Sequence, residues 1–373
     1  MNKIQVLVLY GGKSGEHEVS CRSASSICTH LDRDRYSLTL CGINRSNRWF
    51  LQPPQVLKDA VSGGSPVRIE EHDDLEVYGM PGVGLRTAAN ERVETDIVFP
   101  VIHGTYGEDG TLQGFLETLG LAYTGSGVFA SAACFDKRMT KQLCSAAGIP
   151  SVDSLSVHLD STSHGVSEAV KQQVSSRWPG QPVFVKPARC GSSVGVSRVA
   201  ALSGLPDALR VAARYDCDIL IEPEIRGREL ECAITGNDSI TAHAVGEVQP
   251  LKGFYDYRTK YINEDGAALT IPALVEKSVY EDVQRIACDA YRACGCSGYA
   301  RVDLFFSEET GDILLNEINT IPGFTSISMF PSLCQENGTG YSDLISLLIR
   351  LGIEQSQLRQ TLSYDFSDME NYQ

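Results

Sequence analysis

Two apolar segments near the end of the chain constrain its fold more than any other feature. Arg301–Phe306 and Asp312–Asn319 are rich in Leu, Ile and Phe, and the turn sequence EETG (308–311) separates them. Short apolar runs joined by a glycine-containing turn are typical of a β-hairpin. Both runs are apolar enough to predict strands that are buried inside a domain.

The polar residues of this hairpin form a pattern of their own. Residues two apart on a strand share a face, so Arg301 points with Asp303, and Glu317 points with Asn319. If the two faces coincide, three oxygen-bearing side chains gather beside one arginine. Hard oxygen ligands suit Mg²⁺, which bridges protein carboxylates to phosphates. The alternative is a polar edge facing solvent. The apolar residues around this cluster indicate that the strands are buried, which disfavours a solvent-facing edge. A buried carboxylate cluster with a single arginine would be unstable unless it bound further cations.

The beginning of the chain predicts a parallel α/β sheet. Lys3–Tyr10 is a nearly continuous apolar run, and a Gly-Gly turn leads from it to a predicted helix over Glu18–Leu31. Asp96–Ile102 predicts a second buried strand and Thr111–Leu119 a short helix. Strands that alternate with helices form parallel sheets. Residues 52–95, rich in Gly, Pro and charge, predict loop and edge structure.

The rest of the chain predicts further elements and two domain joints. Helices are expected at Phe135–Ala147, Ser278–Cys294 and Tyr341–Leu351, and strands at Pro182–Pro187, Val194–Val199 and Ile219–Glu222. Joints near Gly127 and Glu222 divide the chain into an N-terminal α/β domain (1–126), a smaller central domain (127–221) and a C-terminal α+β domain (222–373).

Charge and cysteine content exclude several classes of partner. The formal net charge is -15, whereas a nucleic acid or an anionic membrane needs a basic face, so neither partner is expected. No run of about 18 apolar residues occurs, so no membrane-spanning helix is expected. The 12 cysteines include no C-x-x-C pair and many lie in apolar segments, which predicts reduced, buried thiols in a cytoplasmic protein.

The segment KPARCGSSVGV (186–196) predicts a phosphate-binding turn. Lys186 ends a strand, and the Gly/Ser turn after it can aim backbone N–H groups at phosphate oxygens. The segment also fits the nucleophile elbow G-x-S-x-G, but that motif needs a following helix and VGVSRV predicts a strand. A plain β-hairpin is a third interpretation, and it leaves the lysine unexplained. The early Gly-Lys-Ser at 12–14 lacks the first glycine of a P-loop, since Leu7 stands there.

Two further segments are weaker signals. In IEPEIRGRELE (221–231), main-chain groups and a carboxylate at a strand-to-linker joint can bind an adenine and a ribose, although charged loops are usually only solvated. GFYDYRTKY (253–261) mixes aromatic and charged residues without a clear period. That composition fits a lid that excludes water from a reactive intermediate, and equally a surface loop with exposed aromatic residues.

Taken in order, these motifs resemble the D-alanine–D-alanine ligases of the ATP-grasp superfamily. The resemblance also rests on GGKSGEHEVS (11–20), HGTYGEDGTLQG (103–114), FDKRMTK (135–141) and NEINTIPGFTSISMF (316–330). It implies a three-domain ATP-grasp fold, α/β and α+β, with an N-terminal Rossmann-like parallel sheet. It also implies ATP-dependent ligation of two D-alanines through a D-alanyl phosphate, for peptidoglycan precursor synthesis.

The resemblance implies a role for individual residues. The ATP site would consist of Lys137, Lys186, Ser192 and Ser193 at the phosphates, Glu222, Glu224, Ile225 and Glu229 at the adenine and ribose, and Lys260 on the lid. Two Mg²⁺ ions, which Mn²⁺ can replace, would be held by Asp303, Glu317 and Asn319. The first D-alanine would be bound by Glu16 and His103, and the second by Ser328 and Met329. The catalytic group would be Glu16, Ser192, Tyr261, Arg301 and Gly323.

The chemistry of these residue types agrees with the implied reaction. A carboxylate is a poor electrophile, and transfer of a phosphoryl group from ATP activates it. A second amine then attacks, and Arg301 with the Gly323 N–H would stabilise the oxyanion. The resemblance of the lid segment around Tyr261 implies an amine rather than a hydroxy acid as acceptor. The resemblance also implies a homodimer.

Three alternatives remain at this point. A D-alanine–D-lactate ligase would differ in the lid segment. Another ATP-grasp carboxylate–amine ligase would share the lysines and the metal residues, but not Glu16-His17-Glu18 together with TSIS at 325–328. A nucleotide-binding regulatory protein without turnover would not need the oxyanion arginine, Arg301.

Overall fold

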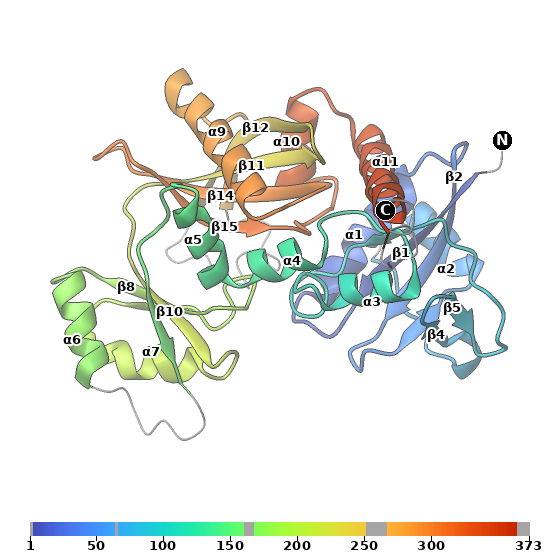
Figure 1. The fold of residues 1–373 in the computed structure, drawn as a ribbon, viewed down its shortest axis with the longest axis horizontal. Coiled ribbons are helices and arrows are strands. Elements are labelled where there is room, and N and C mark those ends of the chain that lie inside the picture. The colour runs from blue at the N-terminus through green and yellow to red at the C-terminus, as the bar shows by residue number, and fades with distance from the viewer. Residues whose placement is uncertain (1–2, 64–65, 160–167, 251–266, 364–373) are drawn as a thin grey trace, which may run out of the picture.

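The computed structural model describes residues 3–63, 66–159, 168–250 and 267–363. Within these residues the chain forms three larger β-sheets and one small hairpin, with helices packed against the larger sheets (Figure 1). The architecture is mixed α/β, as predicted.

The first sheet has the strand order β3-β2-β1-β6. Its central strand β1 (Ile4–Gly11) pairs in parallel with β2 (Tyr36–Ile43) and β6 (Ile97–Pro100), and β3 (Trp49–Leu51) is an antiparallel edge strand. α1 (His17–His30) connects β1 to β2. A central parallel strand is buried on both faces, which explains why the apolar run of β1 is nearly continuous. The predicted parallel sheet is confirmed.

Residues 52–95 contain more regular structure than the sequence indicates. They form α2 (Pro54–Gly63), the 3₁₀ turn η1 (Asp73–Leu75), and a hairpin of β4 (Val77–Met80) and β5 (Gly84–Thr87). The prediction of loop structure was wrong for α2, which begins at a proline. Proline is favoured at the first position of a helix because its missing N–H would have no partner there.

The second sheet is antiparallel and has the order β7-β10-β8-β9. Its strands are β7 (Leu155–His158), β8 (Val183–Pro187), β9 (Ser197–Val199) and β10 (Asp218–Pro223). α6 (Glu168–Arg177) and α7 (Leu205–Ala212) lie together beside this sheet (Figure 1). β9 is shorter than predicted, because residues 194–196 belong to the turn before it.

The third sheet contains the predicted late hairpin. Its order is β13-β12-β11-β14-β15, and all neighbours are antiparallel. The strands are β11 (Arg228–Gly236), β12 (Ile240–Pro250), β13 (Ala267–Thr270), β14 (Tyr299–Phe306) and β15 (Ile313–Asn319). α9 (Lys277–Ala293) and α10 (Met329–Glu336) pack against opposite faces, because Ile234 of β11 joins the core of α9 and Ala233 joins that of α10.

Three short helices lead from the first sheet to the others. α3 (Thr111–Leu119) has the predicted bounds, and α4 (Val128–Phe135) and α5 (Lys137–Ala146) follow it. The helix predicted over 135–147 therefore begins two residues later than expected. Asp136 is extended, and its carboxylate accepts a hydrogen bond from the backbone N–H of Arg138, which caps α5.

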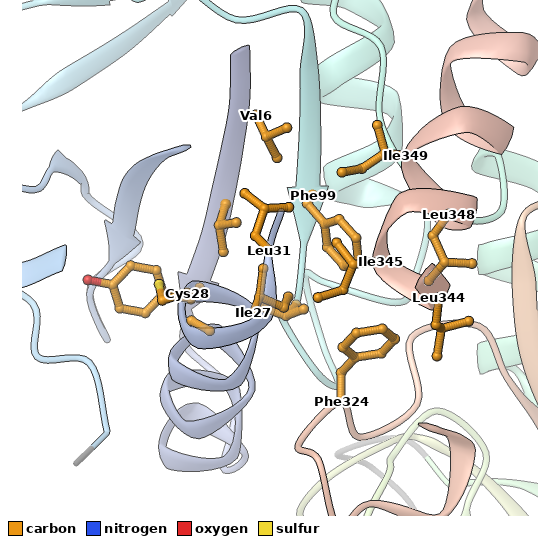
Figure 2. Packing of buried hydrophobic residues seen from close by; sticks show 14 of the residues in the cluster. Val6, Ile27, Cys28, Leu31, Phe99, Phe324, Leu344, Ile345, Leu348 and Ile349 are labelled. Atoms are coloured by element: carbon orange, nitrogen blue, oxygen red, sulfur yellow. The ribbon is translucent and has the colours of Figure 1, made fainter. Parts of the chain in front are cut away.

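The last helix returns to the first sheet. α11 (Tyr341–Gln360) ends nine positions beyond the predicted Leu351, and its apolar face enters a cluster of buried side chains. In Figure 2, Ile345 and Leu348 lie beside Phe99 of β6, and Phe324 completes the group. We propose the three domains expected from the sequence (1–126, 127–221 and 222–373), with α11 as a bridge between the last and the first.

The twelve cysteines are free, and most of them are buried. Cys134 Sγ lies 3.6 Å from Cys296 Sγ, and Cys144 Sγ lies 3.9 Å from Cys294 Sγ, in the core beneath α9. Buried thiols in apolar surroundings agree with the prediction. Among the described residues, the helices are too short or too polar to cross a membrane.

Candidate active site

The two polar faces of the late hairpin coincide. Arg301 lies opposite Asn319, and Asp303 lies opposite Glu317, in the register of β14 and β15. The Asp303 carboxylate accepts two hydrogen bonds of 2.7 Å from the Arg301 guanidinium and one of 2.9 Å from the Asn319 amide. The shared face that the sequence predicts is therefore confirmed.

Arg301 is held between two buried carboxylates. Its Nε lies 2.9 Å from Glu231, which stands opposite Asp303 in the register of β11 and β14. Burial alone would lower the pKa of Arg301, but Asp303 and Glu231 outweigh burial and raise it well above its ordinary value. The guanidinium is thus a permanent, oriented cation. Glu231 was not predicted from the sequence, although the alternation in Glu229-Leu230-Glu231 places two carboxylates on one face of a strand.

A cavity of about 770 Å³ lies between the second and third sheets. The predicted ATP-site residues among its lining are Lys137, Lys186, Ser192, Ser193, Glu222, Glu224, Ile225 and Glu229, and the predicted metal ligand Glu317 lines it too. These residues come from four segments far apart in sequence, and they meet around one space large enough for a nucleotide.

The two predicted phosphate lysines enter this cavity from different elements. Lys137 begins α5; its Nζ lies 3.2 Å from Glu317 and donates a 2.8 Å hydrogen bond to the Cys190 carbonyl. Burial lowers the pKa of Lys137, but Glu317 outweighs burial and raises it. Lys186 lies near the end of β8, with Nζ 2.6 Å from Glu222. Both lysines are buried cations whose charge is balanced by a carboxylate.

The Gly/Ser turn after β8 has a constrained backbone. Ser192 and Ser193 both adopt positive φ, at 53° and 56°, a conformation that costs about 1–2 kcal/mol per residue for a side chain with a Cβ. Strain of this kind is concentrated at ligand-binding turns. Ser192 Oγ donates a short hydrogen bond to Glu16. The turn continues into β9, not a helix, so the nucleophile-elbow alternative is wrong.

Glu224 and its neighbours form the other end of the cavity. Glu224 accepts hydrogen bonds of 2.5 and 2.8 Å from Arg198 of β9, and these bonds lower its pKa. Ile225 and Glu229 line the same wall, Glu229 as the second residue of β11. The segment 221–231 therefore joins β10 to β11 at the cavity wall, where the sequence predicts the adenine and ribose site.

A second group of predicted residues gathers around Glu16. Glu16 is buried at the N-terminus of α1, where a carboxylate is favoured by the helix dipole. His103 is buried as well; its Nδ1 lies 2.8 Å from the Ile321 carbonyl and its Nε2 lies 3.1 Å from Ser23 Oγ. Burial lowers the pKa of His103, so its ring is neutral at pH 7.

Glu108 also belongs to this group, and no role was predicted for it from the sequence. Its carboxylate accepts hydrogen bonds from the backbone N–H of Gly104 and of Ile321, at 2.5 and 3.2 Å. Burial, reinforced by the charge of Glu16, raises its pKa. It lines a small cavity of about 20 Å³ together with Lys137, Glu317 and Asn319. That cavity lies between the phosphate lysine and the hairpin.

The segment after β15 carries the remaining predicted residues. Ser328 is the residue before α10, and its Oγ accepts a 3.0 Å hydrogen bond from the Thr325 backbone N–H instead of capping the helix. A Cβ added at Gly323 would lie 3.3 Å from Ser328 Oγ, so these two positions are adjacent. Met329 is buried and packs against Gly246 of β12. Lys260 and Tyr261, with the whole predicted lid, lie outside the described residues.

The donor set of the hairpin fits Mg²⁺. Two carboxylates and one amide, all with oxygen donors, stand on one face beside Lys137, which is predicted to bind phosphate. In the described part of the chain, no group of three or more His, Cys, Asp or Glu residues is arranged to hold a metal ion by itself. Mg²⁺ commonly uses one or two protein carboxylates and takes its other ligands from water and phosphates, so an open site is what it needs.

Comparisons with known proteins agree with this geometry. Residues 5–126 match the family model described as D-ala D-ala ligase N-terminus, and residues 143–350 match D-ala D-ala ligase C-terminus. The chain is 40% identical to the D-alanine–D-alanine ligase of Shouchella clausii, over 99% of this chain and 100% of that one.

Two solved structures resemble the whole chain. The D-alanine–D-alanine ligase from Coxiella burnetii is similar with a TM-score of 0.80 and 36% identity, covering 96% of this chain and 97% of that one. The VanG D-Ala:D-Ser ligase from Enterococcus faecalis has a TM-score of 0.79 and 31% identity, covering 94% and 100%.

Proposed function

Because the chain belongs to the D-alanine–D-alanine ligase family, we propose that the cavity and the hairpin together carry out that family's reaction. The reaction is the ATP-dependent ligation of two D-alanines, with release of ADP and phosphate, and its product supplies peptidoglycan precursors. The observation that carries the assignment is the cross-strand pair of Asp303 and Glu317, which stands with Arg301 beside the cavity that holds Lys137 and Lys186.

ATP is the co-substrate, and the 770 Å³ cavity is its proposed site. Lys137, Lys186 and the turn at Ser192 and Ser193 would bind the phosphates, since two balanced cations and a strained Gly/Ser turn meet there. The opposite wall, with Glu222, Glu224, Ile225 and Glu229, would bind the adenine and the ribose. Lys260 of the lid would reach the transferred phosphate.

Asp303, Glu317 and Asn319 would hold two Mg²⁺ ions, for which Mn²⁺ can substitute. When bound, the ions neutralise negative charge on the transferring phosphoryl group. Arg301 and Lys137, which balance Asp303 and Glu317 in the structure, would remain beside the same charge. The site therefore concentrates positive charge where the phosphoryl group moves.

The amino acids would bind next to the phosphate turn, around Glu16 and the segment after β15. Glu16 would accept the ammonium group of the first D-alanine, near the neutral His103. Ser328 and the backbone at Met329 would hold the carboxylate of the second, at the N-terminus of α10. The Arg301 guanidinium and the Gly323 N–H would stabilise the oxyanion that forms when the second amine attacks.

The lid would complete the site. A D-alanyl phosphate is hydrolysed by water, so a segment that closes over it protects the reaction. Ser192 already contacts Glu16, which joins the phosphate turn to the amino-acid site, and Tyr261 would extend that link to the lid. We also propose that the protein is cytoplasmic, requires neither nucleic acid nor membrane, and forms a homodimer.

The test is phosphate release from ATP and Mg²⁺ across a panel of D-amino and D-hydroxy acids, with products identified by mass. D-Alanine, supplied as the sole amino acid, should stimulate phosphate release and yield D-alanyl-D-alanine. D-Serine and D-lactate belong in the panel as second substrates, the former because a structure 31% identical to this chain is a D-Ala:D-Ser ligase. Stimulation by another amino acid but not by D-alanine would overturn the substrate assignment.

A further inference from the structure

Lys141 is a buried cation to which the proposed mechanism gives no role. It lies on α5, one helical turn after Lys137, and its side chain is 7% exposed. Its Nζ lies 3.0 Å from Oε1 of Glu222 and donates a 2.7 Å hydrogen bond to the Val152 carbonyl. Among the described residues that line the nucleotide cavity, Lys137, Lys186 and Glu222 occur and Lys141 does not. Lys141 therefore stands behind Glu222.

Glu222 is balanced by two ammonium groups that differ in their access to ATP. Lys186 Nζ lies 2.6 Å from Oε2 on the cavity side, and Lys141 Nζ lies near Oε1 on the protein side. A phosphate bound in the cavity would draw Lys186 away from Glu222. A buried carboxylate that loses its cation is strongly unfavourable, so a second cation is needed at that moment. Lys137 already contacts Glu317 and the Cys190 carbonyl, which leaves Lys141 as the second cation for Glu222.

Glu222 also retains capacity to accept a hydrogen bond. Its Oε1 is buried and, within the described part of the chain, accepts no hydrogen bond of good geometry, although Lys141 is close enough for an ion pair. Lys141 therefore keeps Oε1 occupied by charge, and Oε2 on the cavity side becomes available once Lys186 turns to the phosphates. An adenine amino group is a neutral donor that fits Oε2. Lys141 fixes a second part of the cavity through Val152, whose backbone nitrogen donates a 3.0 Å hydrogen bond to Leu315 of β15.

We infer that Lys141 is a positioning residue of the nucleotide site, which keeps Glu222 an ionised acceptor for adenine while Lys186 binds the phosphates. The inference deepens the proposed function and rests on it. The three buried lysines then have two distinct roles, because Lys137 and Lys186 contact the nucleotide and Lys141 acts through Glu222.

The charges around Glu222 give this role a measurable signature. Lys137 and Lys141 face it from α5 and Lys186 from β8, with Glu317 of β15 beside Lys137. Burial alone would raise the pKa of Glu222, but Lys186 and Lys141 outweigh burial and lower it. In a protein without Lys141, Lys186 is the only cation in contact with Glu222 among the described residues. When ATP binds, Lys186 moves to the phosphates and Glu222 loses this cation, so Glu222 takes up a proton.

The experiment uses the full chain and the variant Lys141→Met, which keeps the length of the side chain and removes its charge. Calorimetry with Mg²⁺ and a non-hydrolysable ATP analogue is performed at about pH 7.5 in two buffers of different ionisation enthalpy, which yields both Kd and proton uptake. The wild type should bind without proton uptake. The variant should bind about tenfold or more weakly and take up a proton. Lys277→Met, at an 88% exposed position, is the matched control and should behave as the wild type.

Wild-type Kd together with no proton uptake in folded Lys141→Met would overturn the inference. If that variant does not fold, the double variant Lys141→Met with Glu222→Gln replaces it, since it removes both charges of this pair. The double variant should fold and bind without proton uptake. A double variant that stays unfolded assigns Lys141 to packing on Val152 and overturns the inference.

Calorimetry also separates this inference from the proposed function. Nucleotide binding needs no D-alanine, whereas ligation does. A wild type that does not bind the analogue contradicts the proposed function itself. If the wild type binds the analogue and ligates D-alanine, and Lys141→Met binds the analogue in the same way, only the inference about Lys141 is contradicted.

Discussion

Asp303 and Glu317 stand directly opposite one another on β14 and β15, and each contacts a different cation. Asp303 is bound by Arg301, and Glu317 lies 3.2 Å from Lys137. One carboxylate pair thereby connects Arg301, the proposed oxyanion group, to Lys137, a proposed phosphate-binding lysine. Substitutions at these positions should therefore affect metal binding and catalysis in different ways.

Replacing either carboxylate of the hairpin should weaken the binding of Mg²⁺. Glu317→Gln and Asp303→Asn each replace a charged oxygen ligand by a neutral amide, so the Mg²⁺ concentration for half-maximal phosphate release should rise about tenfold or more. Titration of activity with Mg²⁺ measures the change, and chelation should abolish activity. Glu308→Gln, in the exposed turn of the same hairpin, is the control. An unchanged Mg²⁺ dependence in both variants would remove the metal site from this face.

Loss of the guanidinium should slow the chemical step. Arg301→Ala should lower kcat by about 10²-fold or more, as loss of an oxyanion donor does, with little change in KM for ATP. The substitution leaves Asp303 and Glu231 without their shared cation, so thermal unfolding is measured alongside. Arg301→Lys keeps the positive charge but lacks the planar guanidinium that donates two parallel hydrogen bonds, so it should give an intermediate rate. A near-normal kcat in folded Arg301→Ala would refute the role.

The carboxylate at the start of α1 should govern the first amino acid. Glu16→Gln removes the charge that would bind the D-alanine ammonium, so KM for D-alanine should rise about 10- to 100-fold. ATP binding, measured separately, should change little. Glu18→Gln provides the control, because Glu18 is on the same helix, with a side chain 68% exposed. Equal effects of the two substitutions would show that Glu16 has no special part in binding the substrate.

An ion pair at the base of the phosphate turn should make stability depend on pH. Asp216, buried, accepts hydrogen bonds from the backbone and the guanidinium of Arg189. Burial raises the pKa of Asp216, but Arg189 outweighs burial and lowers it. Its contribution is therefore complete above the unfolded-state pKa of about 3.9 and is lost as the pH falls through the lower folded-state value.

Asp216→Asn should accordingly destabilise the fold by about 1 kcal/mol at about pH 5 to 8, a modest value because Arg189 is partly exposed. Denaturant unfolding of both proteins from about pH 3 to 8 measures the difference. The difference should be constant above about pH 5 and should shrink below about pH 4. A difference that grows on acidification would contradict the assigned direction of the shift.

The late hairpin was predictable from sequence because its evidence is local. Alternation places Arg301 with Asp303 and Glu317 with Asn319, and the turn at 308–311 brings the two strands together. Local patterns also located β1, α1 and α3 within about two residues. These elements have strong periodicity or clear turn residues, which act over short distances along the chain.

Other features depend on which segments meet, and the sequence does not state that. Glu231 becomes a partner of Arg301 only because β11 lies beside β14. Lys141 becomes a partner of Glu222 only because the fold brings the side chain of α5 to the end of β10. α2 was missed for a different reason, since prolines at its start resemble a loop. The roles of Lys260 and Tyr261 stay predictions.

The course of α11 limits how the chain can be divided. Ile345 and Leu348 cover Phe99 and its neighbours on the first sheet, although more than two hundred residues separate them in sequence. A fragment that stops at residue 126 would leave this apolar face open to water, and such a surface favours aggregation. We therefore expect a soluble N-terminal fragment to need α11, supplied by fusion or by circular permutation.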